Sequence, residues 1–470
     1  MAAQALLVAG TASHVGKSWM ATAICRSLAR RGVKVAPFKA QNMSHNSFPC
    51  VGGGEIGRAQ VAQAAACGLA PHPDMNPILL KPMSDRGSQV VVQGKVWRDL
   101  TAAEYYEQHK YLAGKVEESF ERLAARYEFI VAEGAGSIAE LNLAKTDLVN
   151  MGFATRFDVP VLLVADIDRG GVFGALHGTI DLLTADQRKL VRAFAVNRFR
   201  GGPQLFESGR QLLEEKTGKP CLGVFPHAPE IHLDEEDGVG LEGGRGPSEV
   251  EHPVAILRFP RISNFGDFRL LRSAQWIEEP LNRDFHTLIL PGTKNTAVDL
   301  QWMRSRGLDQ WVLDQHERGA RVLGICGGYQ MLGERIDDPL AVESDLRSVI
   351  GLGLLPVVTV MAAEKTTERV AATTLKGVPF PAYEIHMGQT ERPSGGEPLA
   401  WVAGRPEGMR LGRVAGSYLH GALENPDVAE EWLGFRPGEA ASKEASYDLL
   451  ADWFEDSADP RVLAKLLPGW

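Results

Sequence analysis

A glycine-rich loop between an apolar run and a helical pattern constrains the first half of this 470-residue chain most strongly. The loop Gly-Thr-Ala-Ser-His-Val-Gly-Lys-Ser spans residues 10–18 and follows the apolar run 5–9. A strand, such a loop and a helix in this order wrap backbone N–H groups around a phosphate at the helix N-terminus. Thr11 stands where the usual spacing places a glycine, and Gly10 supplies it one residue earlier. The segment therefore predicts a variant phosphate-binding loop in an α/β domain.

The side chains of this loop indicate how a nucleotide would be held. Lys17 is placed to reach the outer phosphates, and Ser18 is placed to ligate Mg²⁺. The backbone of the glycines would approach the phosphates closely, because they carry no side chain. The expected nucleotide-binding residues are Gly10, Thr11, Gly16, Lys17 and Ser18.

Acidic side chains follow two further apolar runs that we expect to be strands of the same sheet. Glu133 follows the run 128–132, while Asp166 and Asp168 follow the run 159–165. Ligands of open parallel sheets bind beyond the carboxyl ends of the strands, so Glu133 is a candidate Mg²⁺ ligand beside Ser18. Any of these acids could instead be an exposed loop charge. Weaker candidates for the same site are Gln41, Asn42, Asp85 and Asp147.

Alternating strand and helix patterns extend over both halves of the chain and predict two doubly wound α/β domains. A Gly- and Pro-rich stretch at 241–251 is expected to be the linker between them. The predicted organisation is a phosphate-loop domain at 1–240, a second α/β domain at 252–442, and a helical tail at 443–470.

The second half contains a cysteine at a sharp turn between an apolar run and a helical pattern, Gly-Ile-Cys-Gly-Gly-Tyr-Gln. Such an elbow lifts Cys326 clear of the sheet, and the positive end of the following helix stabilises a thiolate. His420 stands at another strand end, and Gly292, after the run 286–290, is a possible backbone donor. The residues alone also allow an inert buried cysteine, so Cys326 is a candidate nucleophile only.

Composition excludes several classes of protein. The formal net charge of −9 does not indicate a general nucleic-acid binder. The five cysteines form no CxxC pair and are odd in number, so a disulfide framework or zinc site is not expected and a reducing cytoplasm is the simplest compartment. No apolar run reaches the roughly 18 residues of a membrane-spanning helix. The pattern carries no information on the oligomeric state.

The elbow resembles the Cys-x-Gly-x-Gln signature of class I glutamine amidotransferases, whose domain is flavodoxin-like. The resemblance implies Cys326 as nucleophile and His420 as base, with Gln330 helping to hold glutamine. It also implies an oxyanion hole from the backbone N–H groups of Gly292 and Gly327. Most of that class follow the histidine with Pro-Glu, whereas here Gly-Ala follows. This is similar to a branch that uses a Cys–His dyad, and it leaves open which group orients His420.

Taken together, the loop at 10–18 and the motifs Pro-Phe-Lys-Ala-Gln-Asn-Met, Glu-Gly-Ala-Gly-Ser, Asp-Ile-Asp-Arg-Gly-Gly-Val-Phe and Gly-Ser-Tyr-Leu-His-Gly resemble the cobyric acid synthase family over nearly the whole chain. The resemblance implies ATP- and glutamine-dependent amidation of four carboxylates (b, d, e and g) of adenosylcobyrinic acid a,c-diamide, a step of cobalamin biosynthesis. ATP with Mg²⁺ would form an acyl phosphate, and glutamine would supply ammonia through an internal path.

Other readings of the same motifs stay open at this point. A related amidase, such as cobyrinic acid a,c-diamide synthase or a peptidoglycan-precursor amidase, shares both the loop and the elbow. A partition-type P-loop ATPase would leave the elbow cysteine and the strand-end histidine without a role. A small corrinoid substrate is the expected partner, without nucleic acid or membrane. Basic residues that could meet its carboxylates are Lys39, Arg58, Lys81 and Arg169.

Overall fold

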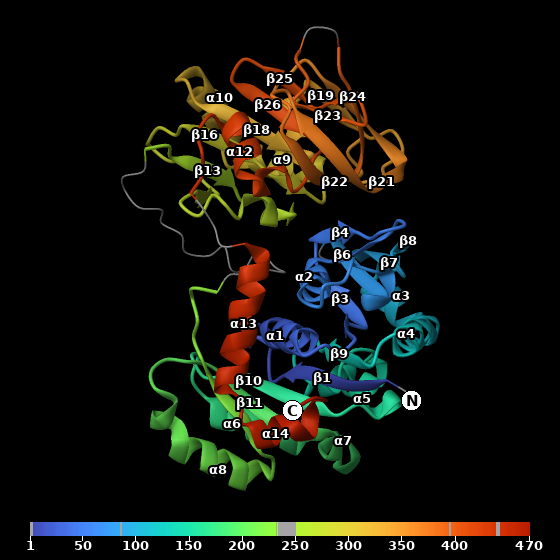
Figure 1. The fold of residues 1–470 in the computed structure, drawn as a ribbon. Helices are drawn as coiled ribbons and strands as arrows, with labels where there is room; N and C mark the ends of the chain where they lie inside the picture. Colours follow the sequence, from blue (N-terminus) through green and yellow to red (C-terminus); the bar gives the residue numbers. More distant parts are fainter. Residues whose placement is uncertain (1–2, 85–86, 232, 234–250, 394–395, 439–441) are drawn as a thin grey trace.

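The computed structural model describes residues 3–84, 87–231, 233, 251–393, 396–438 and 442–470. Two α/β domains lie one above the other, and both termini lie on the first domain (Figure 1). Apart from residue 251, the expected linker at 241–251 lies outside the described residues, and so does Asp85. Within the described ranges, no helix combines the length and the apolar character that crossing a membrane requires.

The first domain is built on a six-stranded parallel sheet in the order β12-β11-β10-β1-β9-β2. The order reverses at β1, the place where open parallel sheets bind ligands. The glycine-rich loop follows β1 directly. The strands are β1 (Gln4–Gly10), β2 (Val35–Phe38), β9 (Phe129–Glu133), β10 (Val161–Asp166), β11 (Val191–Phe199) and β12 (Cys221–Pro226).

Both faces of this sheet are buried, which explains why its strands read as continuous apolar runs. Leu7 and Ala9 of β1 join one apolar core, and Leu6 and Val8 join the other. The first core is covered by α4 (His109–Ala124), α5 (Met151–Phe157), α6 (Val172–Leu182), α7 (Ala185–Leu190) and α8 (Glu207–Thr217). The second is covered chiefly by α1 (Lys17–Arg30), with residues of α2 (Arg58–Ala66) at its edge.

A smaller layer stands between this sheet and the second domain (Figure 1). It holds a four-stranded sheet in the order β3-β6-β7-β8 and a two-stranded hairpin of β4 and β5. Its elements are β3 (Gln41–Met43), β4 (Ser47–Pro49), β5 (Glu55–Gly57), β6 (Ile78–Ser84), β7 (Gly87–Val92), β8 (Lys95–Thr101) and α3 (Ala102–Glu107).

The second domain has a six-stranded sheet in the order β15-β13-β16-β18-β26-β25, parallel except for β25. The predicted pair of doubly wound α/β domains is thus confirmed. A second sheet, built around the long pair β21 (Val358–Thr374) and β22 (Pro379–Glu391), was not predicted. The elements of the main sheet and its helices are β13 (Val254–Leu257), β15 (Gln275–Ile277), β16 (Thr287–Leu290), α9 (Thr296–Ser305), α10 (Leu308–Glu317), β18 (Arg321–Ile325), α11 (Gly327–Leu332), β25 (Met409–Leu411), β26 (Val414–Ser417) and α12 (Pro426–Leu433).

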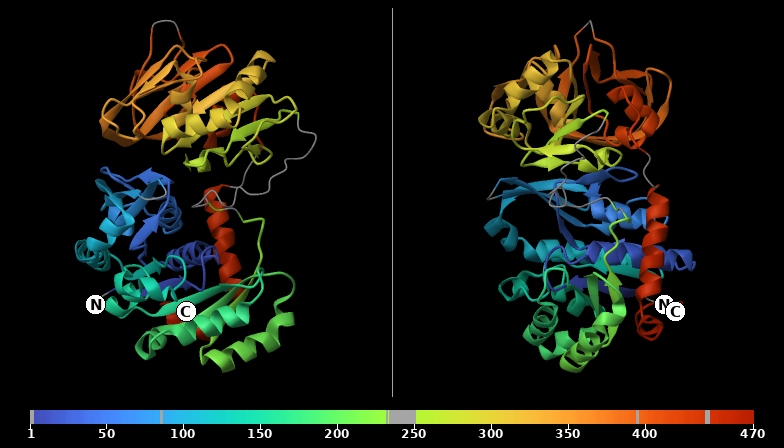
Figure 2. Two further views of the ribbon diagram at one scale, coloured as in Figure 1. Left: turned by 180° about the vertical axis from the view of Figure 1, so that it is seen from behind. Right: turned by 90° about the vertical axis from the view of Figure 1, so that its left-hand side faces the viewer.

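The C-terminal segment returns to the first domain. Helices α13 (Lys443–Ser457) and α14 (Pro460–Leu466) complete the core that α1 covers, and α13 runs beside α1 (Figures 1 and 2). Trp453 of α13 meets Trp19 edge-on with ring centroids 6.0 Å apart, and its indole N–H donates to the Pro226 carbonyl at 2.9 Å. The chain therefore passes from the first domain to the second and back.

Candidate active site

Cys326 lies at a strained turn between β18 and α11. Its backbone has φ 52° and ψ −110°, in the left-handed half of the map where a residue with a side chain is rarely found. The glycines around it are required by close packing, since a Cβ on Gly328 would come within 1.9 Å of the Leu290 carbonyl oxygen. This is the geometry of a nucleophile elbow, in which the sulfur stands beyond the strand end.

His420 follows β26 and is fully buried beside Cys326. Its Nδ1 donates to Asp267 Oδ2 at 2.7 Å, and the next backbone N–H, of Gly421, donates to Asp267 Oδ1 at 2.8 Å. Asp267 stands in a short 3₁₀ helix, Phe265–Phe268, which lies 153 residues earlier in the chain. The group that orients His420 is thus a carboxylate that sequence reasoning missed, because no spacing or motif links the two positions.

The environment of His420 favours its protonated form. Burial alone would lower the pKa of this imidazole, but the charges and hydrogen bonds of Asp267 and Cys326 together outweigh burial. Together they raise the pKa of His420 from the ordinary 6.5 to about 10. A protonated imidazole within hydrogen-bonding reach of the sulfur stabilises negative charge there, as a nucleophilic cysteine requires.

A small cavity of about 40 Å³ lies against Cys326. Gly327 and Gln330 line it, and Gln330 is held by Thr296, whose hydroxyl donates to its Oε1 at 2.8 Å. Gly292 lies against the imidazole, since a Cβ there would come within 3.1 Å of His420 Cε1. The structure therefore brings the predicted glutaminase residues together. Among the described residues, the first domain contributes two to the lining of this cavity, His45 and Lys81.

The phosphate loop closes around its own lysine at the end of β1. Lys17 Nζ donates to the Ala12 and Gly136 carbonyls, both at 2.9 Å, so the ammonium points into the loop. Gly16 has φ 98°, and a Cβ there would come within 2.0 Å of Asn197 Nδ2. The predicted residues Gly10 and Thr11 stand at the start of the same loop, where the Thr11 N–H donates to the Val164 carbonyl at 3.0 Å. A cavity of about 860 Å³ opens over Gly16, Lys17 and Ser18.

Glu133 meets Ser18 at this loop. Ser18 Oγ donates to Glu133 Oε1 at 2.9 Å, and Lys39 Nζ donates to the same oxygen at 2.8 Å. Burial favours the neutral acid, but Lys39, Gln63 and Ser18 outweigh it and lower the pKa of Glu133. A hydroxyl and an ionised carboxylate side by side fit the oxygen ligands that Mg²⁺ prefers. Among the described residues, no group of three or more His, Cys, Asp or Glu side chains is placed to hold a metal ion.

The remaining polar candidates occupy different places. Asn42 lines the cavity over the loop, whereas Gln41 faces a neighbouring cavity and accepts from the Tyr105 hydroxyl. Asp147 accepts hydrogen bonds from the backbone N–H groups of residues 149, 150 and 152, which holds the start of α5.

The two acids that follow β10 are engaged by arginines. Asp166 pairs with Arg198 at 3.0 Å and Asp168 with Arg200 at 2.5 Å. These two acids do not line the described cavities, although Arg198 does.

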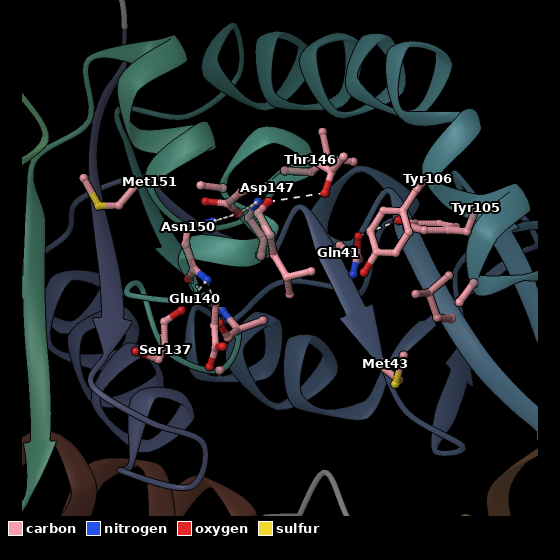
Figure 3. Close-up of a pocket in the computed structure, with 18 of the residues that line it drawn as sticks. Gln41, Met43, Tyr105, Tyr106, Ser137, Glu140, Thr146, Asp147, Asn150 and Met151 are labelled. Atoms are coloured by element: carbon pink, nitrogen blue, oxygen red, sulfur yellow. Dashed lines mark hydrogen bonds between the residues drawn. The ribbon is translucent and has the colours of Figure 1, made fainter. Parts of the chain in front are cut away.

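A second large cavity of about 570 Å³ adjoins the phosphate loop (Figure 3). Gly136 and Met43 line both cavities, so the two spaces meet beside the carbonyl that holds Lys17. Its lining combines apolar side chains with polar ones, among them Gln41, Glu140 and Asn150. Such a lining is typical of a site for a small organic molecule. Among its apolar residues are Met43, Leu80, Pro82, Val90, Leu100, Ile138, Leu141 and Leu143.

The domains contact each other beside the cysteine site. Arg58 of α2 pairs with Glu424 at 3.0 Å and donates to the Tyr383 hydroxyl at 3.3 Å, while the Tyr383 ring stacks on His420. Glu55 of β5 is buried between Lys81 and Lys365 of β21. The basic residues considered for an anionic substrate are therefore engaged in ion pairs within the protein, and these residues are Lys39, Arg58, Lys81 and Arg169. Arg169, which lies 3.9 Å from Asp166, also lines the phosphate-loop cavity.

A phosphate loop and a cysteine–histidine–aspartate site in one chain define a glutamine amidotransferase fused to a nucleotide-dependent synthetase domain. Residues 6–241 match the CobQ/CobB/MinD/ParA nucleotide binding domain family, and residues 253–428 match the CobB/CobQ-like glutamine amidotransferase domain family. The chain belongs to the cobyric acid synthase family, whose members are ATP-dependent glutamine amidotransferase ligases.

Curated relatives match along the full length. The chain is 42% identical to a cobyric acid synthase of Syntrophobacter fumaroxidans, with 100% of this chain and 99% of the relative covered. It is 44% identical to a cobyric acid synthase of Bradyrhizobium diazoefficiens, with 99% of each chain covered. A solved glutamine amidotransferase is 21% identical, covers 38% of this chain and 97% of its own, and gives a TM-score of 0.33.

Proposed function

We propose that this chain converts adenosylcobyrinic acid a,c-diamide to cobyric acid by amidating its b, d, e and g carboxylates, with ATP and glutamine as co-substrates. The similarity to cobyric acid synthases over the whole chain carries the proposal, because it spans both sites and the layer between them. A carboxylate does not react with ammonia at neutral pH. The reaction therefore needs one site that activates the acid and another that releases nitrogen.

In the second domain, Cys326 Sγ would attack the side-chain carbonyl of glutamine. The backbone N–H groups of Gly327 and Gly292 would stabilise the oxyanion, and His420 would pass its proton to the departing nitrogen. Ammonia leaves, and a thioester remains on Cys326. Water then hydrolyses the thioester with His420 as base, which releases glutamate and restores the thiolate and imidazolium. Asp267 would hold the imidazole throughout.

In the first domain, the loop of Gly10, Thr11 and Gly16 would hold the phosphates of ATP, and Lys17 would neutralise charge on the transferred group. Ser18 and Glu133 would hold Mg²⁺, which supplies further charge stabilisation on the phosphates when bound. A carboxylate oxygen of the substrate attacks the γ-phosphorus, the bond to the β-phosphate breaks, and ADP leaves with an acyl phosphate formed on the substrate. Ammonia then attacks the acyl carbon and inorganic phosphate leaves, which produces the carboxamide.

The cavity beside Gly136 is the place we assign to the corrinoid. A corrin macrocycle has apolar faces and a polar rim, which suits a cavity lined by both apolar and polar side chains. Because the cavity meets the phosphate-loop cavity at Gly136 and Met43, a rim carboxylate could reach the γ-phosphate while the ring stays in the apolar part. Gln41, Asn42 and Asp147 would position the substrate or the loops around it. Asp166 and Asp168 would affect the site only by holding the arginines with which they pair.

Mass spectrometry of the corrinoid tests the proposal directly. The protein is incubated with ATP, Mg²⁺, glutamine and adenosylcobyrinic acid a,c-diamide, and the products are followed over time. Each amidation exchanges a hydroxyl group for an amino group, so successive products differ by that mass. We expect a series that ends at the fully amidated cobyric acid and requires ATP. Glutamine hydrolysis without any change in the corrinoid would contradict the proposal.

A further inference from the structure

One residue stands between the two chemical sites. His45 lies in the loop between β3 and β4, and among the described residues it alone lines both the Cys326 cavity and the phosphate-loop cavity. Its neighbour Ser44 lines only the phosphate-loop cavity, and Lys81 of the adjacent strand lines only the Cys326 cavity. The wall between the cavities therefore contains this loop and the part of β6 around Lys81, with His45 at the boundary.

The wall is fixed on both sides. The Ser44 N–H donates to the Leu80 carbonyl at 3.0 Å, which continues the pairing of β3 with β6. On the other side, the side-chain carbonyl of Asn46 accepts the backbone N–H of Asn264, in the second domain, at 2.5 Å. The Asn264 amide in turn lies 3.4 Å from His420 Nε2. His45 thus sits between two anchored residues, and its position relative to both cavities is determined by the domain contact.

The imidazole of His45 has an unusual environment. Within the described part of the chain, its Nδ1 is buried and has no hydrogen-bond partner. Burial, together with the positive charges of Lys81, Lys294 and Arg261, lowers the pKa of His45 to about 4. The ring is therefore neutral at neutral pH. A buried nitrogen without a protein partner costs free energy, so this position favours a small polar molecule such as water or ammonia.

We propose that His45 is the gate through which ammonia passes from Cys326 to the acyl phosphate. The inference rests on the proposed function, which requires that nitrogen released at one site reach the other. Ammonia leaving Cys326 would hydrogen-bond to the unpartnered Nδ1 and continue into the phosphate-loop cavity. Burial and the nearby cations oppose positive charge at this point, so they disfavour ammonium as they disfavour the imidazolium. Ammonia would therefore cross as the neutral nucleophile.

A pair of variants separates the gate from the two half-reactions. His45→Leu removes the ring nitrogens at similar bulk, and His45→Asn keeps a polar group near the position of Nδ1. The measurement is the ratio of carboxamide formed to glutamate formed, with glutamine as nitrogen source. We expect His45→Leu to lower this ratio by about tenfold, because ammonia released without a passage is diluted. His45→Asn should recover much of it. Because His45 lines both cavities, glutamine hydrolysis and ammonium-driven amidation are also measured separately, and the ratio compares nitrogen released with nitrogen used.

The possible results have separate meanings. A ratio in His45→Leu equal to that of the unmodified chain would overturn the gate. If the unmodified chain neither hydrolyses glutamine nor uses added ammonium, the proposed function fails whatever His45 does. Should His45→Leu lose amidation with ammonium as well, its fold is damaged, and an experiment on the unmodified chain decides the matter.

That experiment uses amide-labelled [¹⁵N]glutamine together with unlabelled ammonium in about tenfold excess, since an enclosed passage keeps released ammonia at high effective concentration. We expect the carboxamide nitrogens to carry mainly the glutamine label. Product nitrogen that matches the mixed pool in solution would show that ammonia equilibrates outside the protein, and it would overturn the passage. In His45→Asn the label should stay high, whereas leakage in His45→Leu would dilute it.

Discussion

Asp267 Oδ2 lies 2.7 Å from His420 Nδ1, and this contact between a 3₁₀ turn and a distant strand end fixes the imidazole beside Cys326. With Nδ1 engaged, only Nε2 remains for the sulfur. The same carboxylate also accepts the Gly421 N–H, so it is itself held in place. The Pro-Glu pair that most class I amidotransferases carry after the histidine is absent here. Here Asp267, from the 3₁₀ helix Phe265–Phe268, binds the histidine in place of the glutamate of that pair.

Replacing this carboxylate should impair the release of nitrogen without affecting its use. We expect Asp267→Asn to lower glutamine hydrolysis by about 10²-fold or more, because the imidazole loses both its orientation and its counter-charge. Amidation with added ammonium should remain. Asp427→Asn, which changes an exposed acid paired with Arg436, is the matched control. Glutaminase activity in Asp267→Asn equal to that of the control would contradict a positioning role.

The same pair predicts a pH-dependent contribution to stability. Because the pKa of His420 is raised from 6.5 to about 10, the folded protein binds this proton more tightly than the unfolded chain does. The stabilisation is complete below pH 6.5, declines between 6.5 and about 10, and is lost above that range. The difference in free energy of unfolding between the unmodified chain and Asp267→Asn should therefore shrink across this window. A difference that stays constant with pH would refute this assignment.

Replacing Lys17 of the phosphate loop should impair the use of nitrogen without affecting its release. We expect Lys17→Met to lower amidation by about 10²-fold or more with either nitrogen source, since charge on the transferred phosphoryl group is no longer neutralised. Glutamine hydrolysis should persist, because Cys326 is in the other domain. The control is Lys189→Met, which changes an exposed lysine of α7. Unimpaired ammonium-driven amidation in Lys17→Met would exclude this loop from the reaction.

The corrinoid cavity can be tested with a charge. Leu141 lines the cavity and is 54% exposed, as expected of an apolar side chain that a ligand covers. Leu141→Glu should raise KM for the anionic corrinoid by about tenfold through repulsion and lost apolar contact, and leave KM for glutamine unchanged. Leu205→Glu, at an apolar residue 79% exposed elsewhere in the same domain, should change neither value. Equal corrinoid KM values for the two variants would place the substrate elsewhere.

The sequence predicts those parts of the site that depend on local chain geometry. A phosphate loop and a nucleophile elbow are each built within one strand–turn–helix segment, so the residues of the loop at 10–18 and Cys326 could be named in advance. His420 and Glu133 could be proposed because parallel strands bring their carboxyl ends to one edge. The fold class follows from the same alternation of strands and helices.

Contacts between distant segments could not be predicted in this way. Asp267 lies in an irregular turn, and nothing in its neighbours indicates that it will meet His420. The position of His45 depends on how the second domain docks on the layer of β3 to β8. The packing of α13 against α1 depends on tertiary contacts around Trp453. Asp166 and Asp168 follow the same strand-end pattern as Glu133, yet arginines of β11 and its following loop engage them. Pattern alone cannot distinguish these cases.

The most direct test of the whole account is the amidation rate of Cys326→Ala, measured on the corrinoid with glutamine and, separately, with ammonium. If the second domain only releases nitrogen and the first domain only uses it, the variant should form no carboxamide from glutamine and should amidate with ammonium at the rate of the unmodified chain. Carboxamide formed from glutamine in the variant, or none formed from ammonium, would contradict the division of labour between the two sites.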